Sequence, residues 1–156
     1  GQKKYGLSRD KVNGVVDLTT TYRPGRYLLG FWREFVEFPS TLSTIEFSDE
    51  EPEAGVLHQN VLRTRDQDGK QVYLDVSIQY KLIPEEVGSL YRDMMTYYED
   101  IYIAALRDVL AKVANTFAIH EIWEDYETIS NAMKAKCEEV LAARHAMCWD
   151  LQIWRV

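Results

Sequence analysis

Four side chains in the last third of the sequence are of the types that bind zinc. They are His120, Cys137, His145 and Cys148. Structural zinc sites usually take a close pair of ligands from a tight turn and a second pair from elsewhere. His145 and Cys148 are three residues apart, but Cys137 lies in an apolar pattern of helical period, which predicts burial. The spacing therefore favours core cysteines and surface histidines, and we expect no bound metal.

Neighbouring carboxylates are the second group that could do chemistry. They occur at Glu50-Glu51, Glu85-Glu86, Glu124-Asp125 and Glu138-Glu139. A general acid and a general base need different environments that face one cleft, whereas adjacent residues of a helix point in different directions. The sequence also lacks a nucleophile elbow, a phosphate-binding loop and a dinucleotide fingerprint. We therefore expect no enzyme activity, no cofactor and no small-molecule substrate.

Charge and composition limit the partners further. The 156 residues carry a net charge of −7, and such a chain repels nucleic acid unless its positive charge is clustered. Hydrophobic residues make up 46% and charged residues 28%, as in an ordinary folded domain. The acidic run 48–53 lacks the alternating ligands and central glycine of a calcium loop, so we expect a solvated loop. Two cysteines form no disulfide framework and indicate a reducing compartment.

A small basic cluster interrupts this acidity at the N-terminus. Within residues 1–12 it sets four basic side chains against Asp10, a net charge of +3; they are Lys3, Lys4, Arg9 and Lys11. The cluster predicts either a solvated terminus or attraction to anionic lipid head groups, where each basic residue contributes about 1 kcal/mol. We assign residues 1–13 to this basic segment and residues 14–156 to the folded domain.

The segment 26–35, RYLLGFWREF, gathers aromatic and basic side chains beside a Pro-Gly turn. It fits either a core strand or an interfacial anchor, in which rings lie at head-group depth and arginines contact phosphates. No apolar run approaches the roughly 20 residues of a spanning helix, so we expect peripheral contact with a membrane. Besides the N-terminal cluster, the candidates for that contact are Arg26, Tyr27, Phe31, Trp32 and Arg33.

Alternating apolar and polar residues predict strands in the first two thirds of the chain. Short strands are expected at 15–22, 27–31, 35–38, 41–47 and 56–65. Asp68-Gly69 predicts a two-residue hairpin turn. The run 71–82 then places six apolar residues on one face and polar residues, with Tyr73, on a face that we expect to be wet. We expect this strand and the closing strand each to leave an unpaired edge.

From Pro84 onward the apolar period becomes that of a helix. A second helix is expected from a capping box at Thr96 and Glu99, and a third from about Tyr126. The strand 148–156 closes the chain, with Trp149, Leu151 and Ile153 on one side. This order predicts an α/β fold with α+β-like order: a mixed, largely antiparallel sheet, about three helices packed on one face, and a closing C-terminal strand.

Several of these stretches, in this order, resemble the SPFH domain, also called the band 7 or prohibitin-homology domain, of the stomatin, prohibitin and flotillin superfamily. They are YRPGRYLLGFWREFVEFPSTLSTIEFS, LRTRDQDGKQVYLDVSIQYKLIPEEVGSLY and AALRDVLAKVANTFAIHEIW. The resemblance covers roughly residues 14–156. It implies a domain at a membrane surface that forms oligomers with its own copies or with related subunits, and it implies no catalytic residues. The chain begins abruptly at Gly1 and ends on the strand-like Val156, so we expect a piece of a longer protein. Family members usually have an apolar segment before the domain and a coiled coil after it, and the sequence here contains neither.

We therefore expect a non-enzymatic, membrane-associated scaffold domain that self-associates. The alternative is an adaptor that binds a protein through a strand edge or a helix face without membrane contact. Because stomatin and flotillin relatives face the cytosol, we expect the cytoplasmic side of a membrane rather than the mitochondrion. Strand positions and mixed charges on the third predicted helix indicate self-association, although such charges also suit a solvated face. The candidates are Tyr73, Gln79, Lys134, Glu138, Arg144 and Trp154.

Overall fold

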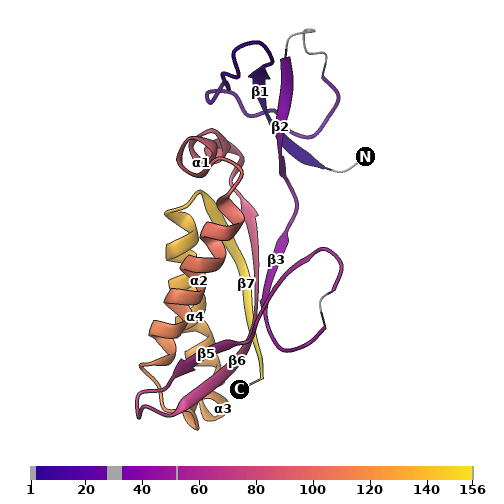
Figure 1. Ribbon diagram of the computed structural model, residues 1–156. Helices are drawn as coiled ribbons and strands as arrows, with labels where there is room; N and C mark the ends of the chain where they lie inside the picture. The colour runs from indigo at the N-terminus through magenta and orange to yellow at the C-terminus, as the bar shows by residue number, and fades with distance from the viewer. Residues whose placement is uncertain (1–2, 28–32, 52, 156) are drawn as a thin grey trace.

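The computed structural model describes residues 3–27, 33–51 and 53–155, except for the side chains of residues 154 and 155. It shows a mixed α+β fold with two sheets, neither closed into a barrel, which confirms the expected fold class (Figure 1). A small lobe, residues 3–40, lies at one end of the molecule. A large lobe, residues 43–83 and 98–155, contains the main sheet and the long helices.

The small lobe is an antiparallel pair of strands, β1 (Lys4–Asp10) and β2 (Arg33–Pro39). Tyr5 and Leu7 of β1 are buried, so these residues of the basic N-terminus form a strand rather than a solvated end. Phe38 of β2 is fully buried and packs against Tyr91 and Tyr98 from the helices, at ring-centroid distances of 6.2 and 5.8 Å. The strand expected at 35–38 is thus present and anchors the small lobe.

The strand expected at 15–22 does not form. Only two isolated bridges join this segment to β1, at Val16 and Tyr22. Between them the Asp17 carboxylate accepts hydrogen bonds from the backbone N–H and the hydroxyl of Thr19, at 2.9 and 2.6 Å. Such a local turn offers the backbone an alternative to the ladder of a sheet. The strand expected at 27–31 lies almost entirely outside the described residues.

The large lobe contains five strands, with β6 (Gln71–Leu82) in the centre. Its neighbours are β3 (Ser43–Phe47), β5 (Leu62–Arg65) and β7 (Ala146–Arg155), and β4 (Val56–Gln59) pairs with β3 in parallel. The Asp68-Gly69 turn forms as expected, with Gly69 at φ 80°. The expectation of a free edge on β6 is wrong for residues 76–80, because β3 and β7 flank them, whereas residues 71–74 pair with β5. Among the described residues β7 pairs only with β6, so its outer side is an edge.

Two long helices cover one face of this sheet, α2 (Tyr98–Ala114) and α4 (Tyr126–Ala142) (Figure 1). The apolar face of β6 meets them and forms one continuous core. The short α3 (Glu121–Glu124) precedes α4. The expected capping box is wrong: α2 starts at Tyr98 without a side-chain cap, so Thr96 and Glu99 do not bracket its first turn.

A linking segment, residues 84–94, joins the two lobes. It consists of the 3₁₀ turn η1 (Pro84–Glu86) and helix α1 (Val87–Met94). Gly88 of α1 is buried against the small lobe, where a Cβ atom would collide with the carbonyl oxygen of Leu18. The absence of a side chain at this position therefore lets α1 approach the small lobe closely.

Two predictions about side-chain direction in the main sheet are wrong. Trp149 is exposed whereas Leu151 and Ile153 are buried, because a register shift of β7 beside Gln79 and Tyr80 turns Trp149 to the other face. Asp75 of β6 is 3% exposed rather than wet.

Candidate functional site

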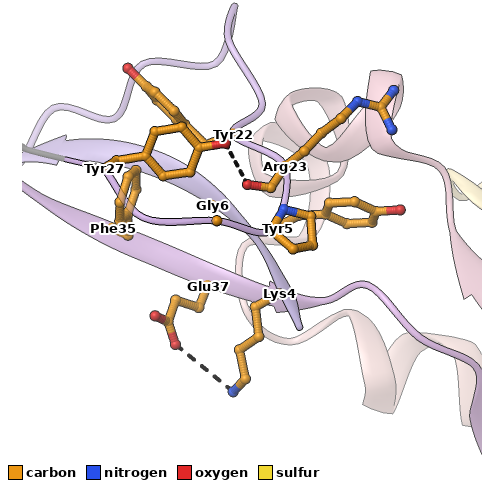
Figure 2. A pocket seen from close by; sticks show the side chains of 10 residues that line it. Lys4, Tyr5, Gly6, Tyr22, Arg23, Tyr27, Phe35 and Glu37 are labelled. Carbon is orange, nitrogen blue, oxygen red and sulfur yellow. Dashed lines mark hydrogen bonds and ion pairs between the residues drawn. The ribbon is translucent and has the colours of Figure 1, made fainter. Parts of the chain in front are cut away.

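The basic side chains proposed for membrane contact divide into paired and exposed groups. Arg9 donates a hydrogen bond from Nε to Glu34 at 2.8 Å, and Arg33 donates from Nε to the Ser8 hydroxyl at 2.6 Å. Lys4 lies 3.9 Å from Glu37, an arrangement that Figure 2 shows beside the aromatic residues. The exposed basic residues are Lys3, Lys11 and Arg26. These three can reach an anionic surface without giving up such a partner.

An aromatic cluster lies on the same lobe, next to these cations. The rings of Tyr22, Tyr27 and Phe35 make edge-to-face contacts with centroids 5.0 to 5.8 Å apart (Figure 2). The Tyr27 hydroxyl donates to the Arg23 carbonyl at 2.6 Å, while 44% of the residue stays exposed. Tyr27 is therefore an exposed aromatic residue in a loop rather than part of a core strand. Phe31 and Trp32 lie outside the described residues.

The hollow beside this cluster is too small for a typical ligand. Its volume is about 90 Å³, whereas small-molecule pockets span about 300–1,000 Å³. Gly6 lines this hollow. A side chain at this position would be crowded, because its Cβ would come within 2.9 Å of the Phe35 ring. The arrangement provides a firm aromatic and basic surface rather than a binding cavity.

Formal charge separates the two ends of the chain. Residues 1–40 contain seven Lys and Arg against four Asp and Glu, a net charge of +3. Residues 41–156 contain 11 against 21, a net charge of −10. An anionic surface therefore attracts the small lobe and repels the rest of the chain. The acidic residues Asp49, Glu50, Glu51 and Glu53 are exposed, as expected for a solvated loop.

The self-association candidates on β6 lie on the sheet face opposite the helices. Tyr73 is 48% exposed, with the Arg63 guanidinium 5.9 Å from its ring centroid. Gln79 lines an open hollow of about 270 Å³ with Ser77, Asp150 and Gln152. Met147 and Trp149 of β7 are also exposed. The sequence pattern missed Trp149 because only the register shift in β7 reveals it.

The remaining candidates lie on or after α4, in the helical layer. Glu138 is exposed and Lys134 is half-buried. Arg144 turns back and donates from a guanidinium nitrogen to the Val140 carbonyl at 2.9 Å, so it satisfies a carbonyl in the last turn of α4. The side chain of Trp154 lies outside the described ones. The structure therefore does not bring the five candidates with described side chains together on one surface.

A groove between α2 and α4 is a further feature of the helical layer. It has a volume of about 430 Å³, and its lining is mainly apolar: Val109, Val113, Phe117 and Ala132, with Thr116, Lys112 and Lys136. Each of its lysines pairs with a carboxylate of its own helix, Asp108 or Glu139. Its chemistry suits apolar side chains of a partner rather than catalysis.

The four suspected zinc ligands do not form one site in the described part of the chain. Cys137 and Cys148 are buried, and burial raises the pKa of the Cys148 thiol to about 11. His120 is exposed. We expected His145 at the surface, and this prediction is wrong, because only 15% of its side chain is exposed. Across the described ranges, no group of three His, Cys, Asp or Glu residues is placed to hold a metal ion.

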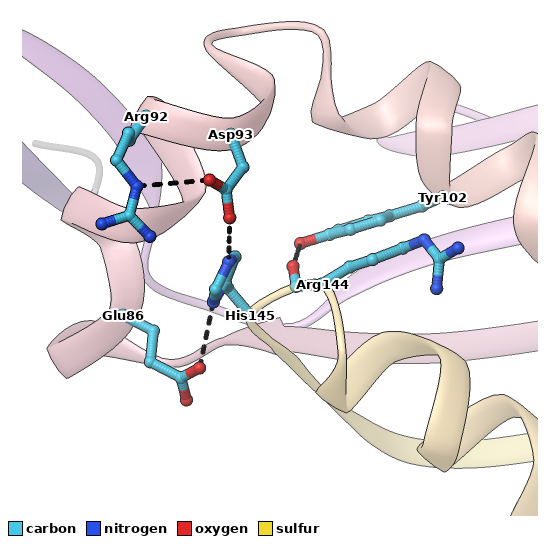
Figure 3. Close-up of polar contacts among 6 residues, drawn as sticks. All are labelled: Glu86, Arg92, Asp93, Tyr102, Arg144 and His145. Atoms are coloured by element: carbon cyan, nitrogen blue, oxygen red, sulfur yellow. Dashed lines mark hydrogen bonds and ion pairs between the residues drawn. The ribbon is translucent and has the colours of Figure 1, made fainter.

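His145 instead lies between two carboxylates from the linking segment. Its Nδ1 is 3.0 Å from Glu86 and its Nε2 is 2.8 Å from Asp93 (Figure 3). Burial by itself lowers the pKa of His145, but the hydrogen bonds and charges of Asp93 and Glu86 raise it above its ordinary value. The two carboxylates contact opposite nitrogens of the ring, so they do not converge on one point as metal ligands would.

Asp66 is a second polar residue that the sequence reasoning missed. Its carboxylate accepts backbone N–H bonds from Asp68, Lys70 and Ile119, at 2.9 to 3.0 Å. Burial opposes its charge, but these donors lower the pKa of Asp66 below its ordinary value. The residue thereby attaches the β5–β6 hairpin to the connection between α2 and α3. Its position just before the Asp68-Gly69 turn was the feature of the sequence that could have predicted this role.

The sequence matches the SPFH domain / Band 7 family over residues 6–146. The chain belongs to this family. SPFH domains are generally found in membrane-associated, non-enzymatic scaffold proteins. A comparison with curated proteins gave no match to this SPFH domain. None of the helices within the described ranges has the length and apolar composition needed to cross a bilayer.

Proposed function

We propose that this SPFH domain is a non-enzymatic scaffold that lies on a membrane through its small lobe and self-associates through its large lobe. The observation that carries the proposal is the charge difference between the small lobe and the rest of the chain, +3 for residues 1–40 and −10 for residues 41–156. It orients the domain at an anionic surface with the small lobe inward. Family membership supports membrane association in general, and we place the domain on the cytoplasmic side.

Vesicle flotation tests the membrane contact. We expect replacement of Lys3, Lys11 and Arg26 by Gln to weaken binding to phosphatidylserine vesicles about a hundredfold, since each contributes about 1 kcal/mol. The matched control replaces Lys70, Lys112 and Lys136 of the large lobe, which removes the same charge from exposed positions. Equal weakening by both sets, or by neither, would contradict contact through the small lobe.

Sedimentation at increasing concentration tests self-association. Tyr73 is an exposed aromatic residue on the open sheet face, so we expect Tyr73→Glu to shift the protein toward smaller species. Tyr97→Glu is the matched control, because Tyr97 is also exposed but precedes α2 at the far end of the large lobe. A wild-type protein that stays monomeric at the highest concentration, or equal effects of both variants, argues against assembly through this face.

The alternative is an adaptor that binds a protein without touching a membrane. The outer edge of β7 favours it, because β7 pairs only with β6 in the described part of the chain and an added strand could hydrogen-bond there. Flotation separates the two functions, since an adaptor of this kind does not bind vesicles.

A further inference from the structure

His145 occupies the junction between the large lobe and the linking segment. It precedes β7, and its backbone has a φ of 68°, a left-handed conformation that non-glycine residues adopt rarely. Its carbonyl oxygen accepts the backbone N–H of Ile83, just before η1, at 3.3 Å. Such unfavourable backbone geometry persists only where the surroundings hold the residue firmly, and it often marks switch regions.

The imidazole ring contacts both ends of the linking segment. Glu86 closes η1 on one side of the ring and Asp93 lies near the end of α1 on the other, at 3.0 and 2.8 Å (Figure 3). A neutral imidazole carries one N–H and can donate to only one carboxylate, whereas the protonated ring donates to both. The observed geometry therefore suits the charged form, and loss of the proton leaves one carboxylate facing a lone pair.

The other charged and titratable groups around the ring are also accounted for. Arg92 donates from Nε to the second oxygen of Asp93 at 3.3 Å. The Tyr102 hydroxyl of α2 donates to the Arg144 carbonyl at 2.6 Å, which fixes the turn that carries His145 (Figure 3). The Arg144 guanidinium is engaged with the Val140 carbonyl. Glu86 and Asp93 are thus the groups that contact the ring directly.

The opposite side of the linking segment holds the small lobe. Gly88 lies against the Leu18 carbonyl, and the Tyr91 ring contacts Phe38. Glu85, the neighbour of Glu86, forms an ion pair with Arg23 at 2.9 Å. Any movement of residues 84–94 away from His145 therefore disturbs the contacts that position the small lobe.

We propose that His145 is a pH-sensitive fastener that holds the linking segment, and through it the small lobe, to the large lobe. The fastener is closed when the ring is protonated and loosens when the proton is lost. It does not depend on membrane contact, so its test and the vesicle test can fail separately. Because the folded pKa is raised, the contribution is complete below the unfolded pKa of about 6.5 and is lost as pH rises through the folded pKa.

Hydrogen exchange of the full chain tests the fastener. After correction for the intrinsic effect of pH, we expect amides of residues 84–94 and 14–22 to open about tenfold more at pH 9 than at pH 6, as expected for loss of a charge-assisted hydrogen bond. His145→Gln should remove this pH dependence, whereas His58→Gln and His120→Gln, at the other two histidines, should retain it. Constant protection in the wild type, or an unchanged pH dependence in His145→Gln, would overturn the proposal.

A second variant keeps the test informative if His145→Gln does not fold. Asp93→Asn removes one charge from an exposed position and preserves the shape of the side chain. We expect it to lower the imidazole pKa of His145, measured by NMR titration, and to shift the opening of residues 84–94 to lower pH by the same amount. A lowered imidazole pKa without a matching shift in opening would show that the ring does not hold the segment.

Discussion

The two lobes differ in both charge and packing. Residues 1–40 carry a net charge of +3, and residues 41–156, which comprise the large lobe and the linking segment, carry −10. The small lobe is a two-stranded sheet, which alone is marginally stable in water, whereas the large lobe has five strands covered by two long helices. The small lobe therefore depends on contacts with the rest of the molecule, among them those of Gly88 in the linking segment and those of Phe38 with Tyr91 and Tyr98. Changes at the junction therefore alter the surface that we propose for membrane contact.

The largest loss of stability is expected when a buried leucine of the large lobe, rather than one of the small lobe, is replaced by alanine. Leu106 in α2 and Leu7 in β1 are both 0% exposed. We expect Leu106→Ala to lower the free energy of unfolding by about 2–5 kcal/mol, because the packed core cannot close the cavity. Leu7→Ala should cost less, since a two-stranded sheet near solvent can relax. Urea unfolding measures both, and equal losses would contradict the difference in packing.

The next effect concerns the contact between the lobes. We expect Gly88→Ala to lower the free energy of unfolding by about 1–3 kcal/mol, because its methyl group would collide with the Leu18 carbonyl. Hydrogen exchange should rise first in residues 14–22. Ser89→Ala, at the next position of α1, is the control and should change little. If Gly88→Ala leaves protection of 14–22 intact, the lobes are not held together at this point.

The dependence of stability on acid pH tests the contribution of Asp66 in the large lobe. The pKa of Asp66 is lowered, so its contribution is present above the unfolded value of about 3.9 and is lost as pH falls through the folded pKa. We expect Asp66→Asn to flatten the decline of stability in acid, measured by urea unfolding at several pH values. Asp68→Asn, at an exposed neighbour, should retain the wild-type slope. Identical slopes for all three proteins would refute this role.

The smallest expected effect is that of the ion pair between the lobes. Arg23 and Glu85 are 2.9 Å apart, but their side chains are 62% and 68% exposed. We expect a coupling energy of less than about 1 kcal/mol in a double-mutant cycle of Arg23→Gln and Glu85→Gln, and a further decrease at high salt. A coupling of several kcal/mol would mean that charge, rather than packing around Gly88 and Phe38, holds the small lobe.

Local patterns in the sequence predicted much of the large lobe. The alternation in 71–82, the Asp68-Gly69 turn and the helical periods after Pro84 correspond to β6, its hairpin and the helices. The segment 15–22 also alternates, though less regularly than 71–82, yet it makes only isolated bridges. Period-two alternation does not reveal whether a partner strand is available, and here the Asp17 turn interrupts the pairing.

The sequence by itself determined the family, the fold class and the division of charge between the two ends of the chain, because these depend on residue order and composition. Only the tertiary structure decided the direction of Trp149, the pairing of Arg9 with Glu34, and the contacts of His145. The partners of His145 are 59 and 52 residues away along the chain. Hydrogen bonds of that separation depend on how whole elements pack, and no local spacing encodes them.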